Sequence, residues 1–98
     1  AKWGGFSGCF PVAQKARAEG KIYCPHYLGG GIGLIASAHL LAAVGGPGLL
    51  EIDCNSNSLR EQLAQPFPSL MDGRFELLQT PGLGIEPDLE GLAPHRTL

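Results

Sequence analysis

The sequence predicts an α/β fold with parallel strands and crossover helices in its first half. Short strand-like segments alternate there with longer apolar segments of helical character, which is the pattern of β/α units. The second half is different and consists of turn-rich segments with closely spaced glycines and prolines. The composition is that of a folded chain, with 44% hydrophobic and 16% charged residues. Its 98 residues allow at most one small domain.

The first β/α unit opens the chain. Residues 1–5 (AKWGG) resemble the end of a strand, and a helix is expected over residues 8–19 with a cap near Ser7. Pro11 fits this helix only in its first turn, where a missing N–H matters least. The short segment KIYC at residues 21–24 then predicts a strand.

A second unit follows this strand. A glycine-rich loop leads into residues 32–44, which are apolar on all sides and predict a helix that is buried on several faces. His39 lies within this helix and is expected to be a core histidine with a hydrogen-bond partner. GGPG at residues 45–48 ends the helix. GLLEID at residues 48–53 then predicts a short strand that ends in acidic residues.

The second half predicts only short elements. After the turn-rich segment CNSNS, Ser58 is expected to cap a short helix over residues 59–64. Asp72 and Gly73 together are a strong signal for a hairpin turn. Residues 88–92 are expected to form one helical turn near the end of the chain.

Charge and cysteine content exclude several classes of protein. The net charge is −2, from seven basic and nine acidic residues, and no basic run favours a nucleic-acid partner. An odd count of three cysteines without a C-x-x-C pair disfavours a disulfide scaffold and indicates a reducing compartment, so a cytoplasmic location is expected. No set of about four ligands with zinc spacing is visible, and this chain is expected to bind no metal. The missing initiator Met suggests a piece of a longer protein.

The glycine-rich stretch at residues 24–46 admits three interpretations. Residues 28–50 are long enough and sufficiently uncharged for a membrane span. However, glycines lie near both ends of this stretch and a proline near its second end, so only about thirteen good helix formers remain between them. Residues 31–36 (GIGLIA) fit the pattern G-x-G-x-x-A of a small nucleotide-binding module, with Glu51 twenty residues after Gly31. The segment CPHYLGG, however, separates this loop from its strand. No membrane partner is expected.

The third interpretation is catalytic. His26 follows a proline at the end of one expected parallel strand, and Glu51 lies at the end of the next. In a (β/α)8 barrel, residues at the C-terminal ends of strands form the active site. A histidine can act as a base near neutral pH, and a carboxyl group can stabilise charge that builds on a neighbouring oxygen. A non-catalytic interaction domain is a further alternative.

Four segments resemble a known family. AKWGGFSGC, CPHYLGGGIGLIASAHLLAA, LLEID and DGRFELLQTPGLGIEPD follow one another across nearly the whole chain. In this order they resemble the C-terminal end of the mandelate racemase/muconate lactonising family, a branch of the enolase superfamily. The resemblance implies that residues 1–53 form the end of a modified TIM (β/α)8 barrel, from the end of strand six to strand eight. It implies that residues 54–98 return to pack on an α+β capping domain.

The resemblance also implies a reaction. Family members bind Mg²⁺ through acids on middle barrel strands and remove the proton beside a carboxylate. The substrate would be a small carboxylate or a sugar acid, and the reaction that of an acid-sugar dehydratase or a 2-hydroxy-acid racemase. The complete enzyme is expected to be a homo-oligomer. The capping domain, barrel strands one to five and all metal ligands would lie outside this chain, which alone is expected to be inactive and unstable.

Individual residues take roles from the resemblance. His26 matches the strand-seven histidine that acts as general base or acid. Glu51 matches the strand-eight acid that hydrogen-bonds the substrate carboxylate and its enediolate. Lys2 is a further candidate for substrate binding, and His95 is expected on the surface. The glycines at 29–33 are expected to allow close packing at the barrel rim.

Overall fold

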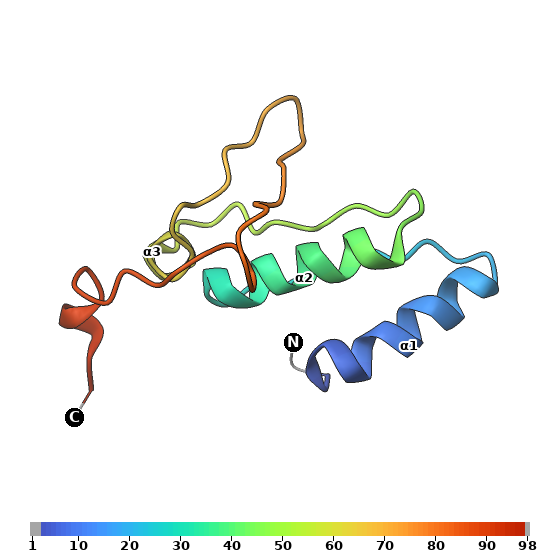
Figure 1. The fold of residues 1–98 in the computed structure, drawn as a ribbon, viewed down its shortest axis with the longest axis horizontal. Helices are drawn as coiled ribbons and strands as arrows, with labels where there is room; N and C mark the ends of the chain where they lie inside the picture. The colour runs from blue at the N-terminus through green and yellow to red at the C-terminus, as the bar shows by residue number, and fades with distance from the viewer. Residues whose placement is uncertain (1–2, 98) are drawn as a thin grey trace.

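The computed structural model describes residues 3–97 and contains four helical segments. They are the α-helices α1 (Gly5–Ala18), α2 (Gly31–Val44) and α3 (Ser58–Gln62), and the 3-10 helix η1 (Ala93–His95). Figure 1 shows α1 near the N-terminus and below α2, α3 near the start of α2, and a long loop that extends away from the helices between α3 and the C-terminal end.

The predicted strands are not formed as regular strands. Within residues 3–97, β-pairing consists of three isolated bridges, and the parallel one joins His26 to Glu51. The expected strands over residues 21–24 and 48–53 are therefore reduced to two extended segments with one point of pairing. A pair of strands without further neighbours has too few hydrogen bonds and too little packing to be stable alone.

Helix α1 begins earlier than predicted. Gly4, with a φ of 108°, precedes its first residue, and Ser7 lies inside the helix, so the expected cap at Ser7 is wrong. Pro11 lies in the helix interior and not in the first turn. It has no N–H for the carbonyl oxygen of Ser7, which lies four residues before it. The helix nevertheless keeps one face against the rest of the protein, because Ala13 is fully buried.

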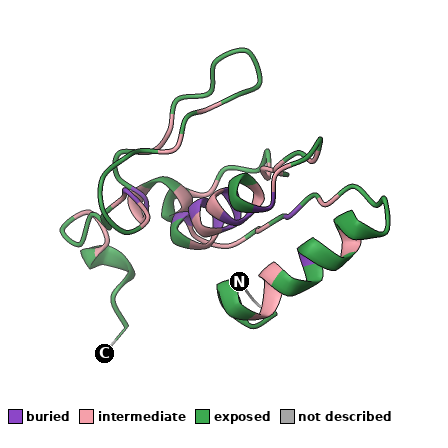
Figure 2. Ribbon diagram, turned by 45° about the vertical axis from the view of Figure 1, so that its right-hand side comes forward, coloured by how far each residue is buried: buried purple, intermediate pink, exposed green. Residues whose placement is uncertain are grey.

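The core lies between α1 and α2. Ala13, Leu40 and Val44 form its buried cluster, and Phe10 and Tyr23 pack against them from two sides. The buried residues concentrate in α2 (Figure 2), which agrees with the predicted apolar helix. This helix packs against α1 on one side and α3 near its start.

Arg17 joins α1 to the end of α2. Its Nη1 atom donates a hydrogen bond to the carbonyl oxygen of Val44 in the last turn of α2. Gly45 and Gly46 follow with φ values of 68° and 90°. A Cβ atom placed on Gly46 would lie 2.8 Å from Nε of Arg17, so glycine leaves the space that the guanidinium occupies.

The second half contains the predicted hairpin turn. Met71 and Arg74 exchange backbone hydrogen bonds of 2.8 and 2.9 Å, and Asp72 and Gly73 between them have φ values of 50° and 72°. Two positive φ values are those of a type I′ turn, which confirms the prediction. The predicted cap at Ser58 is wrong, because Asn57 precedes the helix and Ser58 is its first residue.

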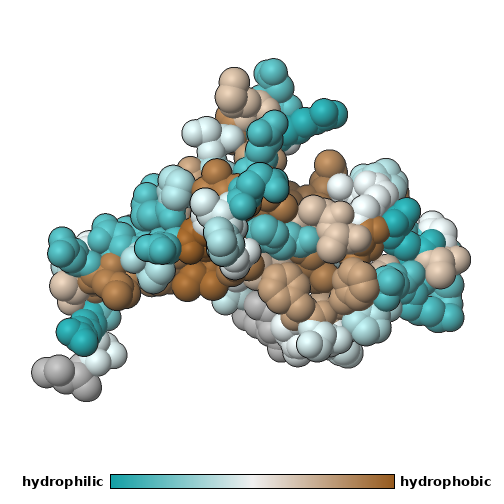
Figure 3. Space-filling model, in the orientation of Figure 1, coloured by the Kyte–Doolittle hydropathy of each residue, from teal (hydrophilic) through white to brown (hydrophobic). Residues whose placement is uncertain are grey.

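Apolar groups remain on the surface. Figure 3 shows hydrophobic side chains over the central part of the molecule. Ile22 and Leu49 on the two extended segments are 66% and 75% exposed. Within the described residues, no helix combines the length and the apolar character that a membrane span requires.

The chain is less compact than a self-contained domain of its mass. Its accessible surface is 7018 Å², whereas a compact monomer of 10.3 kDa exposes about 5,350 Å². Its radius of gyration is 14.3 Å, against about 12.6 Å for a domain of this length. The apolar core is correspondingly small for the number of residues that it must order.

The isolated 98-residue chain is therefore expected to lack cooperative unfolding. Circular dichroism at 222 nm during heating should show a broad loss of helix without a sharp midpoint, and size-exclusion chromatography should show association. Exposed apolar surface and free strand edges both favour this outcome. A monomer that unfolds in one sharp calorimetric transition would contradict the expectation.

Candidate active site

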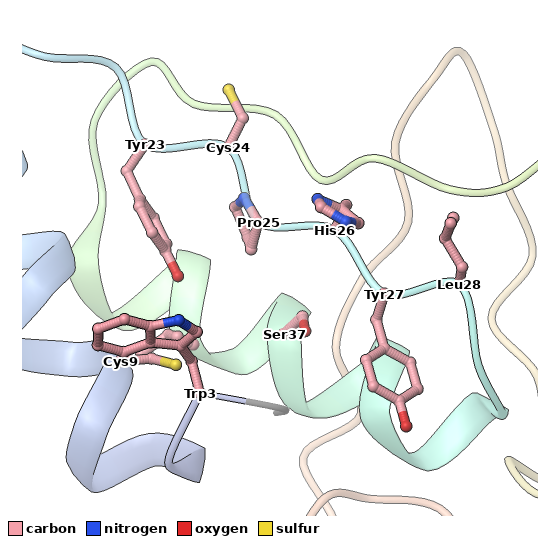
Figure 4. Close-up of a pocket in the computed structure, with 10 residues that line it drawn as sticks. Trp3, Cys9, Tyr23, Cys24, Pro25, His26, Tyr27, Leu28 and Ser37 are labelled. Atoms are coloured by element: carbon pink, nitrogen blue, oxygen red, sulfur yellow. The ribbon is translucent and has the colours of Figure 1, made fainter.

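The segment that carries His26 alternates between two sides. Tyr23 and Tyr27 are half-buried and Pro25 is buried, whereas Cys24 and His26 are exposed. This alternation is that of an extended strand with one covered side. Figure 4 shows Tyr23 and Tyr27 pointing toward the helices, while the side chain of Cys24 points away from them.

His26 and Glu51 are in register. The backbone N–H of Glu51 donates a hydrogen bond of 3.0 Å to the carbonyl oxygen of Pro25, and the parallel bridge pairs Glu51 with His26. Neighbouring strands lie about 4.8 Å apart, and paired residues extend their side chains from the same face. Both residues are exposed. The structure thus brings together the two segments predicted to carry the imidazole and the carboxyl group.

A hollow lies on the helical side of the first segment. Its volume is about 340 Å³, and Trp3, Cys9, Tyr23 and Ser37 contribute to its lining together with His26. Glu51 does not line it. The described residues by themselves therefore do not form the pocket that was predicted to be shared by the two groups.

Tyr23 is protonated at neutral pH. Burial raises the pKa of its phenol above the usual value, and the electrostatic interaction with the nearby Cys9 raises that pKa further. Since an unperturbed tyrosine already has a pKa of about 10, the phenol of Tyr23 is not a base at neutral pH.

The glycine loop serves packing within the protein. A Cβ atom on Gly31 would lie 1.9 Å from the carbonyl oxygen of Arg60 and 2.5 Å from Cβ of Ala64. A Cβ atom on Gly33 would lie 2.3 Å from Cε1 of Tyr27. These distances confirm the predicted close packing at residues 29–33. The start of α2, where a nucleotide phosphate would bind, is covered by α3.

The loop after Glu51 is held by an arginine that the sequence interpretation missed. Nη1 of Arg60 donates to the carbonyl oxygen of Asp53 at 2.7 Å, and its Nη2 donates to that of Asn55 at 3.0 Å. Asp53 also accepts hydrogen bonds from the backbone and side chain of Asn55, at 3.0 and 2.7 Å. The spacing Asp-x-Asn is typical of the turn at residues 53–55, but it contains no signal for the hydrogen bonds of Arg60.

The two other histidines lie on separate elements, α2 and η1. Lys2 lies outside the described residues. His39 is half-buried, and its Nε2 atom lies 3.1 Å from the carbonyl oxygen of Leu83, so it joins α2 to a later loop as a histidine with a partner. His95 is exposed in η1, as predicted.

The described residues do not fit a Mg²⁺ site on their own. Such a site uses several converging oxygen ligands. Within residues 3–97, no group of three or more His, Cys, Asp or Glu side chains is placed to hold a metal ion.

Comparison with known proteins identifies the family. Residues 1–91 match the family described as enolase C-terminal domain-like. The chain is similar to an arabinonate dehydratase of Saccharolobus solfataricus, with 32% identity over 81 residues, which are 83% of this chain and 21% of that protein. It thus spans about a fifth of the length of this relative. No solved structure gives a significant match. The chain belongs to the enolase C-terminal domain-like family, in agreement with the resemblance noted in its sequence.

Proposed function

We propose that this chain is the C-terminal part of an acid-sugar dehydratase of the enolase superfamily. The parallel register of His26 and Glu51 carries the proposal, because it presents a base and a hydrogen-bonding acid from adjacent segments. The family match supports the superfamily, and the similarity to an arabinonate dehydratase favours dehydration of a sugar acid.

The proposed chemistry uses both side chains in turn. The imidazole of His26 takes the proton from the carbon next to the substrate carboxylate, and the released electron pair forms an enediolate. The carboxyl group of Glu51 hydrogen-bonds the substrate carboxylate, and this interaction strengthens as negative charge grows on the carboxylate oxygens. The enediolate then expels the hydroxyl group of the next carbon, which leaves as water with the proton from His26. The resulting enol becomes a 2-oxo-3-deoxy acid.

The other walls of the site would come from polypeptide outside this chain. Residues 1–53 would supply the end of the barrel, and residues 54–98 would return to a capping domain. The exposed face beside His26 and Glu51 would then line the barrel interior. Mg²⁺ would be held by acids of the other part, since the described residues form no such site. The complete enzyme is also proposed to be a homo-oligomer.

The test starts from the DNA immediately upstream of Ala1. The proposal expects an in-frame coding region with spaced acidic metal ligands, and its product joined to this chain is called the completed enzyme below. Incubation of the completed enzyme with Mg²⁺ and a panel of sugar acids, arabinonate included, should yield a 2-oxo-3-deoxy acid from at least one of them. Unrelated upstream sequence, or no reaction with any sugar acid, would contradict the proposal. Racemisation of a substrate without loss of water would show that the completed enzyme is a racemase and not a dehydratase.

The nucleotide-binding alternative predicts a different result. Its phosphate site would require the start of α2, which α3 covers through the close contact of Gly31 with Arg60. Titration of the purified chain with NAD or ATP is therefore expected to give no response up to millimolar concentration. Saturable binding that depends on Gly33 would restore the alternative.

Substitution of Gly31 by alanine tests the packing role of the loop. In an unobstructed helix, this change stabilises a protein by about 0.5–1 kcal/mol. Here the new methyl group meets the carbonyl oxygen of Arg60, and overpacking of this kind costs about 1–3 kcal/mol. Calorimetry of the completed enzyme should show a lower Tm for Gly31→Ala. The control Ile32→Ala changes an exposed neighbour in α2 and should shift the Tm little. An unchanged or higher Tm for Gly31→Ala would contradict the packing role.

A further inference from the structure

The ring of Tyr27 occupies a socket made by two glycines. A Cβ atom on Gly29 would lie 2.6 Å from Cε1 of this ring, and one on Gly33 would lie 2.3 Å from the same atom. Both distances are shorter than a carbon–carbon contact allows, so the ring rests directly on backbone at both positions. Figure 4 shows the ring in front of the first turns of α2.

His26 lies between two residues that are fixed on the helical side. Pro25 before it is buried, and its ring restricts φ to about −65°. Tyr27 after it is held in the glycine socket. His26 itself is exposed. No regular strand stabilises this segment within residues 3–97, and one backbone hydrogen bond joins Glu51 to Pro25. The two flanking side chains therefore determine the direction in which His26 extends.

We propose that Tyr27 is a positioning residue for His26, and that Gly29 and Gly33 are glycines because they form its socket. This inference rests on the proposed function of His26 as a base. The ring provides most of the anchor, because the three atoms nearest to a Cβ atom on Gly33 would be the ring carbons Cε1, Cζ and Cδ1. A Cβ atom on Gly29 would lie 2.6 Å from Cε1 and 2.9 Å from the hydroxyl oxygen. Removal of the ring would let residues 25–27 shift, and a misplacement of about 1 Å at a reacting group can lower a rate about a hundredfold.

The test compares four variants of the completed enzyme with the wild type. Tyr27→Leu should lower kcat about ten- to a hundredfold with KM within about twofold, because substrate binding depends on other groups. Tyr27→Phe keeps the ring and should retain wild-type kcat. Gly33→Ala fills the socket and should reproduce the effect of Tyr27→Leu. In the double variant Tyr27→Leu/Gly33→Ala, the two reductions in kcat should not multiply, because each single change already removes the same contact.

Tyr23→Leu is the matched control. Tyr23 also faces the helical side, but it packs in the core with Ala13 and Leu40 and lies three residues from His26. Its substitution should lower the Tm while kcat per folded molecule stays unchanged. A Tyr27→Leu enzyme that shows only a lower Tm, like this control, would overturn the positioning role. If the reductions in kcat of the two single variants multiply in the double variant, the contact between Tyr27 and Gly33 is not what positions His26.

A spectroscopic measurement separates this inference from the proposed function. The Hα signals of Gly33 in the completed enzyme should carry an aromatic ring-current shift that Tyr27→Phe preserves and Tyr27→Leu removes. If the wild-type enzyme shows this shift but has no activity, the proposed function is refuted, and so is the positioning role of Tyr27. The contact between Tyr27 and the two glycines would still be confirmed. An active wild type without the shift would overturn the socket alone.

Discussion

Replacement of His26 by asparagine is expected to abolish exchange of the substrate α-proton with solvent in the completed enzyme. A general base contributes about 10²–10⁴-fold to a rate, and asparagine cannot accept this proton. The fold should persist, because His26 is exposed and substitutions at such positions change stability by about 0.5 kcal/mol or less. Deuterium incorporation from D₂O, followed by NMR at the carbon next to the carboxylate, measures the effect.

His95→Asn is the control for this experiment. His95 is exposed in η1 and makes no contribution to the segment pair that carries His26 and Glu51. This variant should exchange the proton at the wild-type rate. Normal exchange in the His26→Asn enzyme would remove His26 from the mechanism, and equal losses in both variants would indicate a general effect of histidine removal.

Substitution of Glu51 by leucine is expected to lower kcat about 10²–10³-fold, the loss seen when one donor to a developing oxyanion is removed. The backbone should stay in place, since the hydrogen bond to Pro25 comes from the backbone N–H of residue 51. Glu51→Gln should lose less, because an amide N–H can still donate a hydrogen bond to the substrate carboxylate.

Steady-state kinetics with the best sugar acid measures both variants. Glu76→Leu provides the control, because Glu76 is an exposed carboxylate in the loop that extends away from the helices. It should leave kcat and KM unchanged. Equal kcat values for wild type and Glu51→Leu would show that the carboxyl group takes no part in the reaction.

The helices could be predicted from the sequence because their signals are local. The apolar run over residues 32–44 and the glycines after it define α2 almost to the residue. The hairpin turn at Asp72 and Gly73 likewise depends on the two residues that adopt positive φ. The predicted caps at Ser7 and Ser58 were wrong. Gly4 precedes the first residue of α1, and Asn57 precedes the first residue of α3.

The strands depend on contacts that the local sequence does not contain. KIYC and GLLEID have strand-like patterns, but a pair of strands without further strands or packing is at best marginally stable. Within the described residues each segment has one partner, and the pairing shrinks to the bridge between His26 and Glu51. The sequence did predict that both residues lie at the ends of adjacent parallel segments, and the bridge pairs these two positions.

The packing role of Tyr27 and the hydrogen bonds of Arg60 could not be read from spacing. Both depend on which backbone atoms approach after folding: the ring meets Gly33 six residues later, and the guanidinium returns to Asp53 seven residues earlier. Glycines in a loop are compatible with anion binding and with close packing alike. Only the positions of α3 and the tyrosine ring distinguish the two.

The most direct test is the crystal structure of the completed enzyme with a bound sugar acid. We expect an imidazole nitrogen of His26 to face the carbon beside the substrate carboxylate. We also expect a carboxyl oxygen of Glu51 to lie about 2.6–3.2 Å from an oxygen of that carboxylate, within hydrogen-bond distance. Side chains of these residues on opposite faces of the paired segments, or a substrate bound elsewhere, would contradict the account.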